Sequence, residues 1–160
     1  MLFRSHLEKA LAIKKEIGDR IGEACCYENL GNVYQSVGEF EQARKHSEES
    51  LAIHKEIGDR RGEATCYANL GNVYESFGEY EKAGELVEKS LAIQIEIGNS
   101  RGEAGCYRSL GVLYDKVGEY TKGSHFHEKA LSIGRKIGDR HTAAFCYLDR
   151  SEERRVGKEC

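Results

Sequence analysis

The chain has 160 residues, a formal net charge of −3, and acidic and basic residues interspersed along its length. Such a balance exerts no long-range attraction on nucleic acid or on an anionic membrane, so neither partner is expected. No apolar run approaches the roughly 20 residues that span a bilayer, and residues 1–15 lack the apolar core of a signal peptide. The composition therefore predicts a soluble, cytoplasmic protein.

An internal repeat of 40 residues organises the sequence. Residues 21–60 and 61–100 are identical at 24 of 40 positions, and every glycine of the first segment returns in the second. Self-similarity at a fixed period is the signature of a repeat array, in which each unit contacts only its neighbours. The sequence therefore predicts a solenoid that presents a surface, with no single central core.

Glycine turns separate the predicted helices along the chain. Residues 1–17 carry apolar residues at spacings of three, four and seven, which indicates one buried face of a helix. A glycine that ends one helix and an Asp or Asn that caps the next recur at Gly18-Asp19, Gly58-Asp59, Gly98-Asn99 and Gly138-Asp139. A second glycine, Gly38, Gly78 or Gly118, divides each repeat into two antiparallel helices. We expect first helices at 20–36, 60–76 and 100–116, second helices at 39–57, 79–97 and 119–137, and a last first helix from about 140.

These helices define one predicted array over residues 1–148. It consists of a half repeat 1–18, full repeats 19–58, 59–98 and 99–138, and a half repeat 139–148. The pattern ends at Asp149, and residues 149–160 form a polar tail. Two origins of this tail stay open, a non-native vector-derived extension and a native polar cap of the terminal repeat.

Neither the cysteines nor the histidines indicate catalysis or metal binding. Four of the six cysteines occupy one repeat position, and equivalent positions of stacked repeats exceed the roughly 7 Å over which a disulfide forms. We expect them to be small buried hydrophobes, at Cys26, Cys66, Cys106 and Cys146. Cys25 and Cys26 are adjacent without ligand spacing, and no pattern brings Cys25 to His46 or His54. The sequence therefore predicts no enzyme, no metal and no cofactor.

A known repeat family shares the aromatic, glycine and alanine positions of this pattern. Residues Tyr27, Leu30, Gly31, Tyr34, Gly38, Phe40 and Ala43 resemble the tetratricopeptide repeat, and Tyr67, Leu70, Gly71, Tyr74, Gly78, Tyr80 and Ala83 match again. The third repeat departs at Gly123, where alanine is expected. The resemblance implies an all-α fold, a right-handed α-solenoid of antiparallel helix pairs. The 40-residue period, with Asn-Leu-Gly-Asn and Leu-Ala-Ile-x-x-Glu-Ile-Gly-Asp-Arg, is most similar to G-protein signalling modulators of the Pins type.

The same resemblance places a binding groove on the first helices. The matching groove positions are Glu28, Asn29, Asn32, Gln35, Asn69, Asn72, Glu75, Arg108, Ser109 and Lys116. Asn29 and Asn32 share one helical side because they are three residues apart. An amide donates and accepts hydrogen bonds, which suits the backbone of an extended peptide. The alternative is that these asparagines only cap turns or bond locally.

The groove residues lead to three hypotheses about function. The first is a non-enzymatic protein-interaction scaffold that binds an extended, moderately acidic peptide of a partner protein. The second is self-association through exposed ends of the array, and the third is the sensor portion of a larger regulatory enzyme or ATPase. A clamp for chaperone carboxylates would need basic residues where this chain has Glu28, Gly105 and Ser109, so that partner is disfavoured.

Overall fold

The computed structural model describes residues 2–138 and shows an all-α fold over this range. Its helices are α1 (Leu2–Glu16), α2 (Arg20–Ser36), α3 (Phe40–Ile57), α4 (Arg60–Ser76), α5 (Tyr80–Glu96), α6 (Ser100–Lys116) and α7 (Tyr120–Lys136). Each predicted boundary up to residue 137 agrees to within one residue. The predicted helix from about 140, the half repeat 139–148 and the tail lie outside the described residues. No helix in the described range has the length and apolarity of a membrane span.

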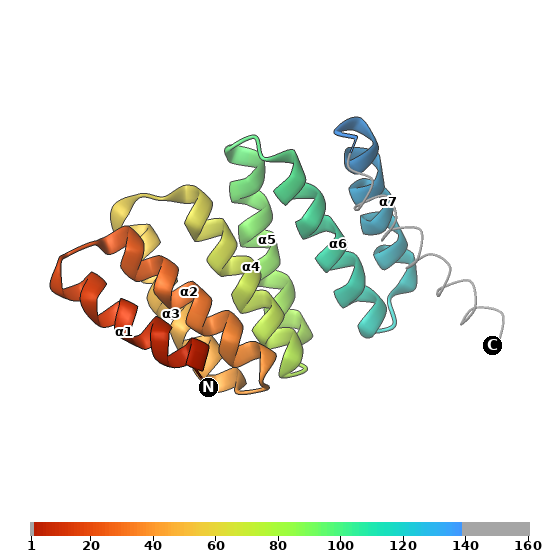
Figure 1. Cartoon of the computed structure of the whole chain (residues 1–160). Helices are drawn as coiled ribbons and strands as arrows, with labels where there is room; N and C mark the ends of the chain where they lie inside the picture. The colour runs from red at the N-terminus through yellow and green to blue at the C-terminus, as the bar shows by residue number, and fades with distance from the viewer. Residues whose placement is uncertain (1, 139–160) are drawn as a thin grey trace. The chain divides into compact units, whose positions relative to one another are not determined.

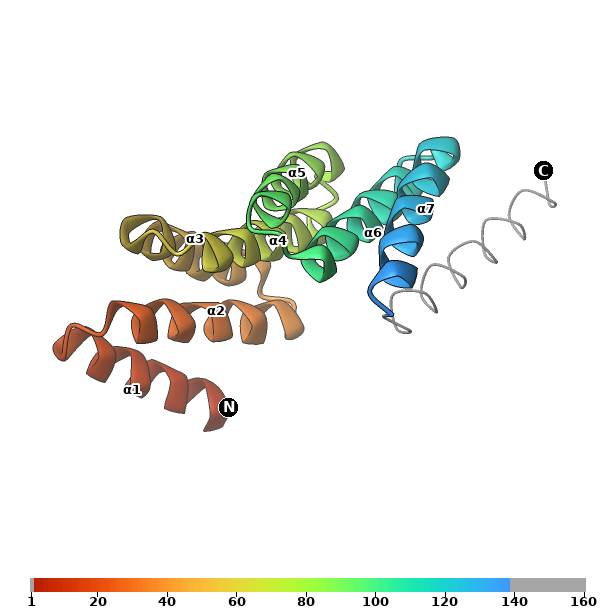
Figure 2. The ribbon, with the colours of Figure 1, turned by 90° about the horizontal axis from the view of Figure 1, so that it is seen from above.

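The chain separates into two compact units, residues 1–86 and 87–160. In the first unit α1 packs against α2, α2 against α3, and α3 against α4, and consecutive helices run antiparallel (Figures 1 and 2). In the second unit α6 and α7 form the same kind of antiparallel pair. Each unit is therefore built from the helix pairs that the repeat predicts.

The turns have the chemistry that the sequence predicts. At Gly58 the backbone adopts φ of 72°, a left-handed conformation that glycine reaches without a steric penalty. The next residue, Asp59, caps α4 because its carboxylate accepts hydrogen bonds from the backbone of Arg61 and Gly62, each at 3.1 Å. Asp19 and Asn99 cap α2 and α6 in the same way. The predicted caps are confirmed at these three turns.

Glycines inside the first helices lie where two helices approach closely. A Cβ added to Gly111 would lie 2.5 Å from Cε1 of His127, and one added to Gly31 would lie 3.0 Å from Oγ of Ser47. His127 is fully buried and its Nε2 lies 2.9 Å from Oδ2 of Asp115. The absence of a side chain at these two glycines therefore allows α2 to approach α3, and α6 to approach α7.

Small side chains fill the thin core between helices. Ala24, Ala43 and Ala64 are fully buried, and Leu30 is 1% exposed. The repeated cysteines Cys26, Cys66 and Cys106 are buried free thiols, as predicted, whereas Cys146 lies beyond the described residues.

Candidate functional site

All ten predicted groove residues lie on first helices, namely α2, α4 and α6. The exposed members are Asn29, Asn32, Asn72 and Lys116. The partly exposed members are Glu28, Gln35, Asn69, Glu75, Arg108 and Ser109. Those on α2 and α4 belong to the first unit, where these two helices contact each other, and those on α6 belong to the second unit.

The side-chain amides of the asparagines on α2 and α4 have no hydrogen-bond partner among the described residues. Asn29, Asn32, Asn69 and Asn72 lie inside their helices, so none acts as a cap. Within residues 2–138 no hydrogen bond engages their side-chain amides. The structure thus brings these two pairs of amides onto helices that contact each other.

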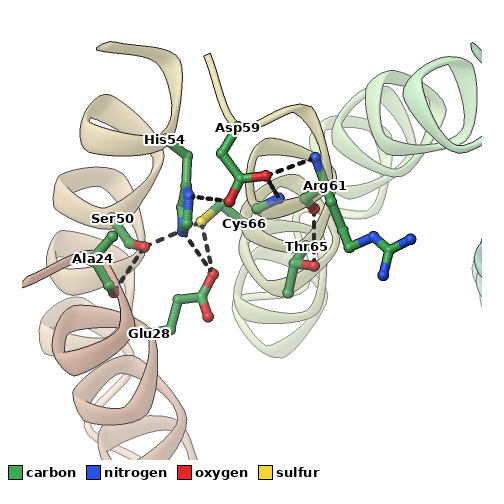
Figure 3. Close-up of polar contacts among 9 residues, drawn as sticks. Ala24, Glu28, Ser50, His54, Asp59, Arg61, Thr65 and Cys66 are labelled. Atoms are coloured by element: carbon green, nitrogen blue, oxygen red, sulfur yellow. Dashed lines mark hydrogen bonds and ion pairs between the residues drawn. The ribbon is translucent and has the colours of Figure 1, made fainter. Parts of the chain in front are cut away.

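Glu28 differs from the other groove residues because its carboxylate turns toward the interior. Its Oε1 lies 3.2 Å from Nε2 of His54 and accepts a hydrogen bond from the thiol of Cys66 at 3.5 Å. Figure 3 shows these side chains converging from α2, α3 and α4, together with Ser50 and Asp59. We refer to these five residues, Glu28, Ser50, His54, Asp59 and Cys66, as the polar cluster.

His54 stands at the centre of the polar cluster because of the turn that follows α3. It lies in the last turn of that helix, and its Nδ1 is 3.0 Å from Oδ2 of Asp59, the residue that caps α4. The ring occupies the space above Gly62, where a Cβ would come within 2.1 Å of Nδ1. The glycine and the cap therefore position a 3% exposed imidazole between two carboxylates.

Cys66 is fully buried, and its thiol faces both Glu28 and the hydroxyl of Ser50, the latter at 3.3 Å. Ser50 in turn donates to the backbone carbonyl of Ala24 at 3.0 Å. Burial raises the pKa of the Cys66 thiol to about 12, so the thiol is protonated near neutral pH. A buried, protonated thiol is not a nucleophile, which argues against catalysis at this position.

Sequence reasoning missed this cluster because its members are distant along the chain. The intervals from Glu28 to His54 and from His54 to Cys66 match no ligand motif, and three separate helices supply them. A comparison of equivalent repeat positions does single out one member of the cluster. His54 stands where the neighbouring repeats have Lys14 and Gln94, so it departs from the repeat at a position that packs inward.

The chain belongs to the tetratricopeptide repeat family. The family's sequence pattern matches residues 4–56, 23–96 and 63–136. No curated protein matches the sequence. Family membership agrees with the fold, because the family is built from helix pairs stacked as an α-solenoid. It does not distinguish the Pins-type subfamily.

Solved structures with the same fold come from several proteins. BtubC from P. vanneervenii is 22% identical with a TM-score of 0.74, covering 97% of this chain and 72% of BtubC. Aspartyl phosphate phosphatase F from Bacillus subtilis is 18% identical with a TM-score of 0.85, covering 97% of this chain and 42% of that protein. A Rap protein complexed with Competence and Sporulation Factor is 19% identical with a TM-score of 0.84, covering 89% of this chain and 40% of the Rap protein. The chain thus spans less than half the length of the last two proteins.

Proposed function

We propose that this chain is a non-enzymatic protein-interaction scaffold that binds an extended segment of a partner protein across α2 and α4. The observation that carries the proposal is the presence of two amide pairs, Asn29 with Asn32 and Asn69 with Asn72, on neighbouring helices without partners in the described part of the chain. A carboxamide offers one acceptor and two donors, which is what an unpaired peptide backbone requires. The membership in a family of interaction repeats supports the same function.

The spacing of the helices suits an extended peptide. Packed helices lie about 8–10 Å apart, and an extended chain advances about 3.3 Å per residue. A peptide that crosses α2 and α4 would therefore meet successive asparagine pairs about three residues apart. Side chains at the intervening positions would point toward neighbouring groove residues such as Gln35 and Glu75.

The positively charged members of the predicted groove lie on α6, in the second unit. These are Arg108 and Lys116, and Ser109 adds a small polar side chain on the same helix. We therefore expect the second unit by itself to favour a moderately acidic segment, whereas binding to α2 and α4 depends on amide hydrogen bonds more than on charge. The Rap protein that shares this fold was solved in complex with another molecule, which supports ligand binding as a use of the fold.

A peptide-library selection on the full chain, followed by titration of the selected peptide, tests this function. Replacing Asn69 and Asn72 together with alanine should weaken binding by about 1–3 kcal/mol, because backbone groups of the peptide lose their partners. The control is Gln42→Ala on α3, another exposed polar side chain outside the first helices, which should leave the affinity unchanged. Equal affinity for the double variant and the parent would place the binding surface elsewhere.

Self-association is a second candidate function, favoured by apolar side chains at one end of the first unit. Ile13, Ile17 and Ile21 are 56%, 64% and 63% exposed. Neighbouring exposed apolar residues are typical of surfaces that another protein covers. Light scattering over a concentration series should show association, and Ile17→Asp should reduce it. A monomer at every concentration would exclude this candidate.

A further inference from the structure

We propose that Glu28, His54 and Cys66 bind one transition-metal dication, with Zn²⁺ as the preferred ion. The carboxylate oxygen, the imidazole nitrogen and the thiol sulfur all lie within 4.8 Å of one another. These are three of the ligand types that zinc takes in proteins, and three protein ligands leave a fourth position for water. The site lies between α2, α3 and α4, inside the polar cluster of Figure 3.

The separations between the ligand atoms agree with tetrahedral coordination. Bonds of about 2.0–2.3 Å at tetrahedral angles place ligand atoms about 3.3–3.8 Å apart. Glu28 Oε1 lies 3.2 Å from His54 Nε2 and 3.5 Å from Cys66 Sγ. The Glu28–Cys66 pair thus already has the required spacing, and the Glu28–His54 pair is about 0.1 Å short of it.

The orientation of the His54 ring favours metal binding over hydrogen bonding at Nε2. Although Nε2 is close to the Glu28 carboxylate, the contact does not have hydrogen-bond geometry, and both ring nitrogens are buried without a hydrogen bond. A buried polar atom without a partner is costly and uncommon. When two atoms bind the same metal ion, their lone pairs point at the ion and not at each other. A metal ion between Nε2 of His54 and Oε1 of Glu28 would therefore give the unpaired nitrogen a partner.

Asp59 provides the outer partner that histidine ligands usually have. Its Oδ2 lies 3.0 Å from Nδ1 of His54, while its Oδ1 accepts from the backbone of Arg61 and Gly62 and so holds the carboxylate in place. This contact, like the one at Nε2, does not have hydrogen-bond geometry in this structure. A rotation of the ring on metal binding would turn it into a hydrogen bond from Nδ1–H to the carboxylate, which leaves Nε2 for the metal. The capping residue of α4 thereby becomes a positioning residue of the site.

The ligand types and their exposure favour Zn²⁺ over Mg²⁺ or Ca²⁺. A sulfur and an imidazole ligand suit a borderline-soft ion, whereas the two hard cations take oxygen ligands. The side chain of Glu28 is 22% exposed, which gives the ion and a fourth ligand water a route from solvent. Coordination requires the thiolate, so binding displaces the Cys66 proton to solvent.

Metal titration of the purified full chain under reducing conditions tests the site. Zn²⁺ should bind with one ion per chain and raise the unfolding temperature, because the ligands come from three helices that must be folded to meet. Co²⁺ should produce thiolate-to-cobalt charge-transfer absorption that Zn²⁺ then abolishes. The charge-transfer band requires a sulfur ligand, so it reports a cysteine thiolate bound to the metal, and the cysteine variants identify which cysteine it is.

The repeat supplies matched controls. Cys66→Ser should remove the cobalt band, whereas Cys106→Ser at the same position of the next repeat and Cys25→Ser should retain it. His54→Gln introduces the residue that the next repeat has at this position, so it should fold normally and weaken Zn²⁺ binding at least tenfold. Asp59→Asn preserves a cap like Asn99 and should weaken binding by about 10- to 100-fold.

Three outcomes would overturn the metal site. The first is the absence of stoichiometric Zn²⁺ or Co²⁺ binding by the folded chain. The second is a cobalt band that survives Cys66→Ser, which would assign the sulfur ligand to another cysteine. The third is unchanged Zn²⁺ affinity in His54→Gln, with circular dichroism confirming that the variant is folded.

Discussion

Two turns of the chain have the same backbone conformation and different side chains. One joins α3 to α4, and the other joins α5 to α6. In the first, His54 faces the capping Asp59 above Gly62. In the second, Gln94 takes the place of the histidine and accepts a hydrogen bond at 2.8 Å from the side chain of Asn99, the capping residue. The first pair can ionise, and the second is neutral.

This comparison extends to the aromatic stacks of the two units. In the first unit His46 stacks on Tyr34 with ring centroids 5.1 Å apart. In the second unit Phe126 occupies the equivalent position and stacks on Tyr114 at 5.3 Å. At these two pairs of positions, His54 with Gln94 and His46 with Phe126, the side chains occupy equivalent places and differ in polarity, and the ionisable member lies in the first unit.

The largest expected difference between the two turns concerns their glycines. A Cβ at Gly62 would lie 2.1 Å from a rigid ring nitrogen of His54, whereas one at Gly102 would lie 2.4 Å from the flexible amide of Gln94. Gly62→Ala should destabilise the fold by about 1–3 kcal/mol through overpacking. Gly102→Ala should cost little, because the glutamine moves and alanine favours the helix by up to about 1 kcal/mol.

Urea unfolding followed by circular dichroism measures both variants. The control is Gly62→Ala combined with His54→Gln, which gives the first turn the flexible side chain of the second and should restore most of the lost stability. Equal unfolding midpoints for Gly62→Ala and Gly102→Ala would show that the ring does not restrict the turn.

A smaller effect is expected in the aromatic stacks. Burial lowers the pKa of His46, with Lys45 adding to the shift and Glu49 opposing it. Its Nδ1 is buried without a hydrogen bond, so His46→Phe, which copies the second unit, should stabilise the fold by about 1 kcal/mol at neutral pH. Unfolding curves of the two proteins at pH 7 give this difference.

The same substitution should change the pH dependence of stability. With a folded pKa below the unfolded value of about 6.5, the unfolded state binds the proton first. The wild type should therefore be fully stable above about pH 6.5 and lose stability as the pH falls below it, and His46→Phe should lose less. Parallel pH profiles for the two proteins would contradict this assignment.

The smallest effect is expected for an ion pair at the start of α4. Arg60 pairs with Glu63 at 2.5 Å, whereas α6 begins with Ser100, which has no charge to offer Glu103. Arg60→Ser should cost less than about 1 kcal/mol, since one partner is exposed. The loss should shrink further in 1 M salt as screening weakens the pair. Urea midpoints at low and high salt provide the measurement, and a loss that grows with salt would show a different cause.

The amino-acid sequence by itself determined the helices, their caps and the pairing of neighbours. Local signals were sufficient because residues such as Gly58 and Asp59 define a turn through their own backbone and side chain. The 40-residue repeat places the same signals at each equivalent turn, so each turn supports the prediction of the others. The groove asparagines could be assigned to first helices for the same reason. Whether their amides were used locally could not be predicted, since that depends on the rotamers and neighbours of each side chain.

Only the tertiary structure decided the polar cluster. Glu28 was placed with the groove residues because its position on α2 follows the repeat, yet its side chain turns toward α3 and α4. Its partners His54 and Cys66 come from those helices, and the helix packing that joins them is not visible in sequence spacing. The repeat pattern predicts the helix face on which each side chain lies. Whether three side chains from different helices meet depends on how those helices pack, and residues far apart in the sequence determine that packing.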